Sequence, residues 1–318
     1  MPHDPLIATL PALARPHLAP HLPDWLQPRW YSGKQEALAM GPGAHIGWFD
    51  LYDKPALSAV IANAADMRWY NTVLAGLDGL PLRDLHTRGL RVTNGAGLNA
   101  VTIAEYVLMG MLTIAKGYRA IVRAQDRHEW MPEPPGRAEL AGSRALVLGY
   151  GGIGKLVAQQ LGALQVEVTV VRRQEDTSDR VLGPAQWRER LGEFDWVILA
   201  VPATPETERM IGAAELAAMK PGAVLLNVAR GVVVDHDALV QALRTGHLGA
   251  AFLDVTDPEP LPPDHPLWSL DNAHITMHLS GRAQTRMFER ASQRFLDNLA
   301  RFRAGEPLAF EVDLQRGY

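Results

Sequence analysis

The sequence contains no cysteine among its 318 residues. This absence excludes disulfides, thiolate metal sites and cysteine nucleophiles. The sequence also lacks any apolar run near the about 18 residues that a membrane-spanning helix needs. Its proline-broken first 20 residues show no signal-peptide pattern. These absences favour a soluble, cytoplasmic protein.

An excess of basic residues is missing as well. The formal net charge is −4 and the cationic residues are scattered along the chain, so neither nucleic acid nor a membrane is expected as a partner. Apolar residues make up 47% and charged residues 21%, which is ordinary for a globular protein. Because 318 residues exceed what one compact core usually encloses, we expect two domains.

The first hundred residues mix short apolar runs with turns. We predict strands or strand edges at residues 44–50 and 57–63, and a clearer strand at residues 90–94. Prolines are dense between Pro2 and Pro28, which predicts an irregular opening. Residues 98–125 carry apolar side chains at helical spacing on a wide face, which predicts one long, well-buried helix.

The second half has a different rhythm. After a proline-rich linker at residues 131–140, short continuous apolar runs alternate with helical patterns. Unbroken apolar strands between helices indicate a parallel sheet that is covered on both faces. The predicted strands are residues 145–149, 166–171, 196–201, 223–229, 249–255 and 274–279, and the predicted helices are residues 155–164, 213–219, 236–246 and 285–305.

A glycine-rich turn follows the first of these strands. Gly149, Gly151 and Gly154 stand between the strand and the next helix. The first glycine permits a tight turn, the second lets a pyrophosphate approach the backbone, and the third lets helix and strand pack closely. Free N–H groups at the start of the helix would receive the phosphate charge. The sequence therefore predicts a dinucleotide site.

The next strand ends in two arginines. Such folds usually place an Asp or Glu there, about 20 residues beyond the glycines, to accept hydrogen bonds from the ribose hydroxyls. This chain has Arg172 and Arg173. A carboxylate would repel the 2′-phosphate of NADP(H), whereas a guanidinium can bind it through paired, charge-assisted hydrogen bonds. We therefore favour NADP(H) as the cofactor and keep NAD(H) as the alternative; the arginines would otherwise only solvate a strand end.

Three further segments place chemistry-bearing residues where apolar strands end. Arg230 follows one strand, Asp254 and then Glu259 follow another, and His278 follows the last. In open α/β sheets, ligands bind at these carboxyl ends. Each residue alone has a plain structural explanation: a capping arginine, a loop glutamate or a core histidine. Their common position behind a dinucleotide turn favours a catalytic reading.

Several long motifs resemble the D-isomer-specific 2-hydroxyacid dehydrogenase family. They are "LAGLDGL", "LRVTNGAGLNAVTIAEYVL", "GYGGIG", "VPATPETERMIG", "MKPGAVLLNVARGVVVD", "DPEPLPPDHPLW" and "HLSG". The ending "VDLQRGY" and the double arginine are most similar to the glyoxylate/hydroxypyruvate reductase branch. The resemblance implies two Rossmann-like parallel-sheet domains with a cleft between them: a flavodoxin-like substrate lobe (residues 1–97 and 283–318) and a dinucleotide-binding lobe (residues 98–282). It also implies a homodimer.

Family roles carry over to matching positions. Arg230 would bind the carboxylate and carbonyl oxygen of a small 2-oxoacid, His278 would donate the proton, and Glu259 would keep the imidazole protonated. Ala75 and Gly76 would bind the substrate carboxylate through their backbone amides. Trp48 would line the substrate pocket, although a tryptophan beside a strand more often lies in the core. The residues expected to line the cofactor are Gly149, Gly151, Gly152, Ile153, Gly154, Arg172, Arg173, Val201, Pro202, Thr207, Asn227, Val228, Ala229, Asp254, His278 and Gly281.

Some readings remain open. A 3-phosphoglycerate dehydrogenase is the runner-up; such enzymes often carry an extra regulatory domain, which we do not expect here. Formate dehydrogenase is disfavoured because that relative has glutamine where Glu259 stands. The same fold also serves as a dinucleotide-sensing corepressor, which keeps the three catalytic residues. No metal is expected: His17 and His21 have helical spacing, but the surrounding prolines disfavour a regular helix.

Overall fold

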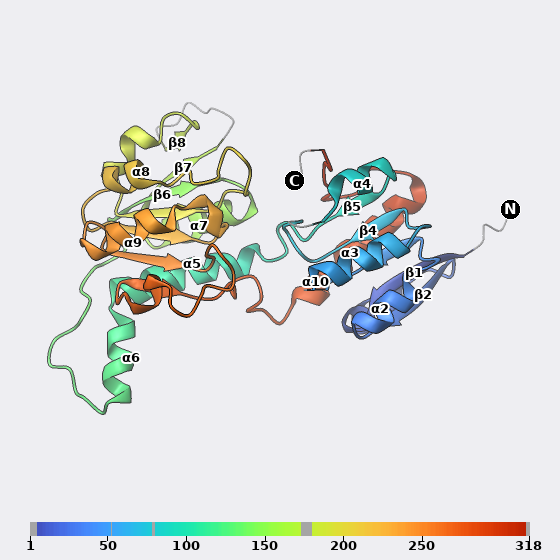
Figure 1. Ribbon diagram of the computed structural model, residues 1–318, viewed down its shortest axis with the longest axis horizontal. Helices are drawn as coiled ribbons and strands as arrows, with labels where there is room; N and C mark the ends of the chain where they lie inside the picture. The colour runs from blue at the N-terminus through green and yellow to red at the C-terminus, as the bar shows by residue number, and fades with distance from the viewer. Residues whose placement is uncertain (1–4, 52, 78–79, 173–179, 316–318) are drawn as a thin grey trace. The chain divides into compact units, whose positions relative to one another are not determined.

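The computed structural model describes residues 5–51, 53–77, 80–172 and 180–315. The chain divides into two compact units, one formed by Met1–Asn99 with Gln284–Tyr318 and the other by Ala100–Ala283. Each unit is built on its own parallel sheet (Figure 1), so the predicted fold class of two parallel-sheet α/β domains is confirmed. Along the chain, the first boundary lies two residues after the predicted one, and the second boundary lies one residue after the predicted one.

Unit 1 contains a five-stranded sheet in the order β2-β1-β3-β4-β5, with every pair parallel. This is the flavodoxin-like order 2-1-3-4-5. Helices α1 and α10 contribute to the core on one face, and α2, α3 and α4 contribute to the core on the other. The strands are β1 (Leu6–Pro11), β2 (Leu26–Tyr31), β3 (Ile46–Trp48), β4 (Trp69–Asn71) and β5 (Arg91–Thr93); the helices are α1 (Arg15–Leu18), α2 (Lys34–Met40), α3 (Lys54–Asn63), α4 (Leu82–Thr87) and α10 (Met287–Ala304).

The proline-rich opening is more regular than predicted. It contains β1 and β2, which pair in parallel over their whole length, with a short helical stretch between them. Pro11 ends its strand, and Pro28 lies in β2, which is an edge strand. An edge strand tolerates the missing N–H of Pro28.

The strand predicted at residues 57–63 is wrong, because this segment is the C-terminal part of helix α3. Asp53 caps the helix: its side-chain oxygen accepts a hydrogen bond from the N–H of Ala56 at 3.0 Å. Pro55 in the first turn supports a helix start. The buried residues of α3 lie on one helical stripe, namely Ala56, Leu57, Val60 and Ile61.

Unit 2 contains a seven-stranded parallel sheet in the order β12-β11-β10-β9-β6-β7-β8. The chain moves outward from β6 first in one direction and then in the other, so the switch point of a dinucleotide-binding sheet lies at β6. The strands are β6 (Arg144–Leu148), β7 (Glu167–Val171), β8 (Val181–Leu182), β9 (Trp196–Leu199), β10 (Val224–Asn227), β11 (Ala250–Leu253) and β12 (Ala273–Ile275); the helices are α5 (Ala100–Ala115), α6 (Tyr118–Asp126), α7 (Gly152–Ala163), α8 (Ala213–Ala218) and α9 (His236–Arg244).

Both faces of this sheet are buried. Along β6, Ala145 and Val147 face one core with α5 and α7, while Leu146 and Leu148 face the other core with α8 and α9. Alternate residues of a strand point to opposite faces, so a strand with two cores must be apolar throughout. This is the physical reason for the unbroken Val- and Leu-rich runs in the sequence.

The single long helix predicted at residues 98–125 is two helices, α5 and α6, that are bent by 70°. The break falls at Gly117, whose φ of 62° is left-handed. A Cβ at Gly117 would lie 2.9 Å from the backbone of Gly136. Helix α6 extends away from the sheet (Figure 1) and has Ala124 as its buried residue, so only the first part of the predicted helix is well buried.

Within the described ranges, no single helix combines the length and the apolarity that a bilayer crossing requires, and α5 and α6 meet both measures only as a bent pair.

Candidate active site

The glycine turn between β6 and α7 has the geometry that a dinucleotide requires. Gly149 has a φ of 102°, and a Cβ there would lie 2.5 Å from the carbonyl oxygen of Ala200. A Cβ at Gly154 would lie 1.9 Å from the carbonyl oxygen of Gly149, so only glycine lets the helix pack this closely. At Gly151, the residue that caps α7, a Cβ would meet nothing within 4 Å.

This open space lies at the N-terminus of a twelve-residue helix. The first N–H groups of a helix, here including those of Gly152 and Ile153, have no acceptor within the helix and attract an anion. The turn therefore fits the pyrophosphate of a dinucleotide.

Arg172 directly follows β7, the strand beside β6. Its backbone N–H donates to the carbonyl oxygen of Leu182 at 3.1 Å, which holds the residue at the carboxyl end of the sheet. Arg173 lies outside the described residues. The structure thus places Arg172 at the predicted position for recognising the adenosine ribose.

Val201 and Pro202 follow β9 and begin a closed turn. The hydroxyl of Thr207 donates to the carbonyl oxygen of Pro202 at 2.7 Å and accepts from the N–H of Thr204 at 2.8 Å. Thr207 therefore shapes this loop at the carboxyl edge of the sheet.

Asn227, at the end of β10, organises the turn that presents Arg230. Its buried side chain accepts from the N–H of Ala229 at 3.0 Å and donates to the carbonyl oxygen of Arg230 at 2.9 Å, enclosing Val228. The Arg230 guanidinium donates to the carbonyl oxygen of Ala229 at 2.7 Å. The side chain of Asn227 is thus fully used in shaping the turn.

The residue after Arg230 explains how this turn meets the loop of Glu259. A Cβ at Gly231 would lie 2.0 Å from the carbonyl carbon and oxygen of Thr256, so the two loops touch backbone to backbone. Thr256 donates its N–H to Glu259 Oε1 at 3.1 Å and its hydroxyl to the carbonyl oxygen of Pro258 at 3.0 Å. Gly231 was missed at the sequence level because its need for glycine arises from a distant segment.

Asp254 anchors the loop that presents His278. Its Oδ1 accepts from Thr276 Oγ1 at 2.7 Å and from the N–H groups of Leu279 and Ser280 at 3.0 and 3.1 Å, and its Oδ2 accepts from the Ser280 hydroxyl. The carbonyl oxygen of Asp254 also accepts from the N–H of His278 at 2.5 Å. The carboxylate is 2% exposed and holds the loop in place; its predicted contact with the nicotinamide stays a prediction.

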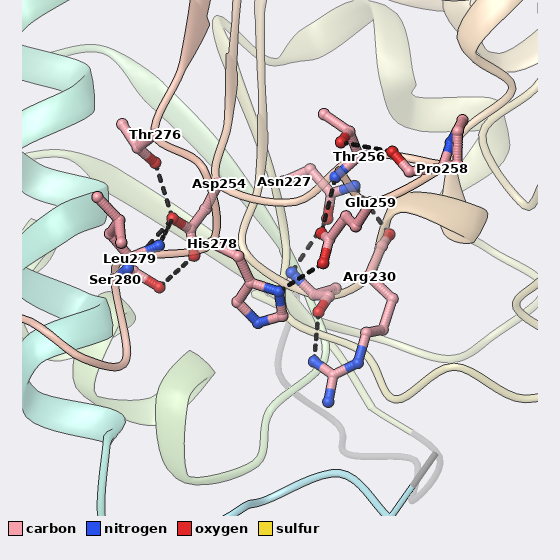
Figure 2. A network of polar contacts seen from close by, with 11 residues as sticks. Asn227, Arg230, Asp254, Thr256, Pro258, Glu259, Thr276, His278, Leu279 and Ser280 are labelled. Atoms are coloured by element: carbon pink, nitrogen blue, oxygen red, sulfur yellow. Dashed lines mark hydrogen bonds and ion pairs between the residues drawn. The ribbon is translucent and has the colours of Figure 1, made fainter. Parts of the chain in front are cut away.

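His278 and Glu259 form an ion pair, with His278 Nδ1 2.8 Å from Glu259 Oε2 (Figure 2). The hydrogen bond that His278 donates to Glu259 raises the pKa of His278, although partial burial and the nearby Arg230 charge oppose the rise. Burial raises the pKa of Glu259, but the hydrogen bonds from His278 and the N–H of Thr256, together with the charge of Arg230, outweigh it and lower the pKa overall. Both shifts favour the imidazolium–carboxylate form of the pair, and the charge of Arg230 acts on both groups.

His278 and its neighbour Met277 both have left-handed backbone, with φ of 55° and 53°. Non-glycine residues rarely adopt this conformation, and such strain persists where the surroundings enforce it. Here the bonds to Asp254 enforce it. The His278 side chain remains 47% exposed, so the strained turn presents an accessible imidazole.

Unit 1 holds the other residues expected to contact substrate, besides Arg230 of unit 2. The loop of Ala75 and Gly76 follows β4, and the carbonyl oxygen of Ala75 accepts from Asn94 Nδ2 at 2.8 Å. Ala75 is exposed and Gly76 is half-buried. The accessible backbone of this loop fits the predicted carboxylate contact.

The expectation for Trp48 is corrected. Its side chain is 0% exposed and packs against Phe288 and Phe295 in the core, so it does not wall an open pocket. Instead, its indole Nε1 donates to Asp50 Oδ2 at 2.6 Å.

Asp50 was not singled out from the sequence. Its Oδ1 accepts from Thr72 Oγ1 at 2.7 Å and from the N–H of Val73 at 3.0 Å. Burial raises the pKa of this carboxyl, although the hydrogen bond from Thr72 opposes the rise. Asp50 therefore organises the start of the Ala75–Gly76 loop. A signal existed in the sequence: an acidic residue at the end of the strand predicted at residues 44–50.

In the described parts of the chain, no group of three or more His, Asp or Glu side chains could hold a metal ion. His17 lies in the single turn of α1 and His21 in the 3-10 turn that follows it.

Comparisons with known proteins agree with this geometry. Residues 108–280 match the model of the NAD-binding domain of D-isomer-specific 2-hydroxyacid dehydrogenases. Glyoxylate reductase/hydroxypyruvate reductase from Homo sapiens is 32% identical over 273 residues, which are 83% of this chain and 82% of that protein.

Two solved structures of this family are similar over nearly the whole chain. A family protein from Aeromonas salmonicida is 30% identical with a TM-score of 0.87, covering 98% of this chain and 100% of that one. A family enzyme from Xanthobacter autotrophicus, solved in complex with NADPH and MES, is 26% identical with a TM-score of 0.77, covering 99% and 100%. The chain therefore belongs to the D-isomer-specific 2-hydroxyacid dehydrogenase family of NAD(P)-dependent oxidoreductases.

Proposed function

We propose that this protein reduces a small 2-oxoacid of the glyoxylate or hydroxypyruvate type to the D-2-hydroxyacid with NADPH. The observation that carries the proposal is the His278–Glu259 ion pair at 2.8 Å beside the Arg230 turn. Both lie at the carboxyl edge of the sheet that holds the glycine turn. The glyoxylate/hydroxypyruvate reductase relative supports the substrate class.

The roles follow from charge. A bound nicotinamide would supply a hydride to the carbonyl carbon, and negative charge would then develop on the carbonyl oxygen. Arg230 stabilises that charge and the substrate carboxylate, and His278 donates a proton to the oxygen. Glu259 keeps the imidazole protonated until transfer. In unit 1, the backbone amides of Ala75 and Gly76 bind the substrate carboxylate.

The preference for NADPH rests on Arg172 at the end of β7, with Arg173 next in sequence, in place of the carboxylate that binds ribose hydroxyls. A guanidinium forms charge-assisted hydrogen bonds with a 2′-phosphate. The NADPH bound in the Xanthobacter relative supports this assignment.

We also infer a homodimer that forms through α5, α6 and the segment after them. Large apolar side chains are exposed there in the single chain, including Met109 (43%), Leu112 (44%), Tyr118 (56%) and Trp130 (95%). Clustered apolar exposure of this kind is typical of a protein–protein interface.

The direct test is a panel of 2-oxoacids assayed with each cofactor. Glyoxylate, hydroxypyruvate, 3-phosphohydroxypyruvate and pyruvate are supplied with NADPH or NADH, and oxidation is followed at 340 nm. We expect the highest kcat/KM with NADPH and glyoxylate or hydroxypyruvate. A clear NADH preference would remove the cofactor assignment, and a preference for the phosphorylated acid would favour a 3-phosphoglycerate dehydrogenase. No turnover of any 2-oxoacid would favour a dinucleotide-sensing binding role.

A further inference from the structure

His236 is a buried histidine that the reaction itself does not use. It is the first residue of α9 and is 8% exposed. Its Nδ1 lies 2.9 Å from the carbonyl oxygen of Asp257 and 3.3 Å from the N–H of the same residue. The shorter contact indicates that Nδ1 carries the proton and donates to the carbonyl. The imidazole thus forms a hydrogen bond with the backbone of Asp257, two residues before Glu259.

The other side of the ring supports this tautomer. Among the described residues, Nε2 of His236 is buried without a hydrogen-bond partner. A proton on Nε2 would leave a buried donor unsatisfied, which costs about 1–3 kcal/mol. The titratable groups that face this ring are Asp235, Asp257 and His265, and burial lowers the pKa of His236 despite the two carboxylates. The ring is therefore neutral near pH 7 and acts as a fixed donor.

The position of His236 is itself rigid. Asp235 caps α9, with Oδ1 accepting from the N–H of Ala238 at 3.0 Å. Gly231, five residues earlier on the same segment, packs against Thr256 and Asp257. One segment that begins with the Arg230 turn and ends at the start of α9 therefore contacts the Glu259 loop at two points.

We propose that His236 is a positioning residue that fixes the Asp257–Glu259 segment and so places the Glu259 carboxylate against His278. If this loop were flexible, the Glu259 carboxylate could move away from the His278 imidazole. Here the loop is held by the hydrogen bond with His236, by the close packing of Gly231, and by the hydrogen bond that the N–H of Thr256 donates to Glu259 Oε1. A misplacement of about 1 Å at such a site can lower turnover roughly a hundredfold.

The test compares three substitutions of His236 in the full-length protein. In His236→Asn the amide nitrogen stands where Nδ1 stood, so the hydrogen bond to Asp257 is kept. In His236→Gln the amide nitrogen stands where Nε2 stood, so that bond is lost although the polarity is the same. His236→Leu removes the donor. The control is His247→Leu, which removes a half-buried histidine of the same unit whose backbone carbonyl contacts Gly222.

The first readout is the titration of the His278 imidazole by NMR, assigned with a His278→Gln variant. Glu259, Asp254 and Arg230 are the charged groups that act on His278. We expect the titration midpoint to stay at the wild-type pH in the Asn and control variants and to move to lower pH in the Gln and Leu variants. This readout needs no enzymatic activity.

The second readout is kinetic and rests on the proposed function. With NADPH and the best 2-oxoacid, we expect kcat to fall by about tenfold to a hundredfold in the Gln and Leu variants, with an unchanged Kd for NADPH. The Asn variant should stay within a few-fold of wild type. Folded Gln or Leu variants with an unmoved His278 titration, or an Asn variant as impaired as Leu, would overturn the positioning role. Wild-type inactivity on every 2-oxoacid would instead remove the proposed function and leave the NMR result standing.

Discussion

At the scale of single residues, the proposed role of His278 as proton donor predicts the pH range of reduction. Its pKa is raised chiefly by the hydrogen bond with Glu259. In the proposed mechanism reduction requires the protonated imidazole, so we expect activity at pH values below that raised pKa and its loss as the pH rises through it. The alkaline limb of the pH profile therefore reports the strength of the ion pair.

Glu259→Gln tests this directly. The substitution removes the negative charge but keeps a side chain that can still hydrogen-bond, so the pKa of His278 should fall and the alkaline limb of kcat/KM should move to lower pH. At a fixed pH above that limb we expect kcat to fall by about 10²-fold or more. An alkaline limb that stays in place in a folded variant would show that Glu259 does not set the charge of His278.

Asp50→Asn tests the support of the Ala75–Gly76 loop, which we propose binds the substrate carboxylate. The carboxylate accepts from three donors, on Trp48, Thr72 and Val73. The asparagine amide has one acceptor oxygen, and its NH₂ group faces one of these three donors. The resulting unsatisfied group costs about 1–3 kcal/mol. We expect KM for the 2-oxoacid to rise about tenfold, with little change in Kd for NADPH. Asp66→Asn, at an exposed carboxylate of the same unit, is the control; equal KM values in both variants would separate Asp50 from substrate binding.

At the scale of elements, a methyl group in the turn between β6 and α7 should leave the fold intact but weaken NADPH binding. Gly151→Ala places a Cβ in open space at a φ of −79° that alanine adopts readily. We expect Tm to stay near wild type while Kd for NADPH rises about tenfold or more, because the methyl group occupies the approach of the pyrophosphate.

Gly162→Ala is the matched control in the same helix. Its Cβ also meets nothing within 4 Å, and alanine in a helix stabilises by about 0.5–1 kcal/mol relative to glycine. We expect a slightly higher Tm and an unchanged Kd for NADPH. If Gly151→Ala binds NADPH as tightly as Gly162→Ala does, the pyrophosphate does not lie at this turn.

Unit 2 was largely predictable from the sequence for a physical reason. Two-sided burial of its sheet forces unbroken apolar strands, so the polar residues soon after the strands stand out in the sequence, as with Arg172, Arg230 and Asp254. The turn between β6 and α7 was equally clear because each of its glycines has a local steric role.

Other features depended on contacts that sequence patterns do not carry. The bend at Gly117 arises from its contact with Gly136, and Trp48 is buried by Phe288 and Phe295, which lie far away in sequence. The contacts of His236 and Gly231 with the Glu259 loop are long-range as well. Helix α3 is a different case, because its Asp53 cap and Pro55 were local signals that the strand prediction overlooked.

At the scale of the whole molecule, dimerisation should depend on the exposed apolar side chains of α5 and α6. The double variant Leu112→Glu with Ile121→Glu adds charge at two of them, exposed by 44% and 39%. We expect wild type to sediment as a dimer and this variant as a monomer. Leu13→Glu, at an apolar residue of unit 1 that is 69% exposed, should remain dimeric. A dimer that survives the double substitution would place the interface elsewhere.

The assignment of His278 as proton donor is tested most directly by turnover of the His278→Ala protein. NADPH oxidation with glyoxylate or hydroxypyruvate is compared with wild type, and NADPH affinity is measured in the same preparations. We expect kcat to fall by about 10²–10⁴-fold while Kd for NADPH stays unchanged, since the glycine turn does not involve the imidazole. A kcat near the wild-type value would contradict the role of the Arg230–Glu259–His278 constellation in catalysis.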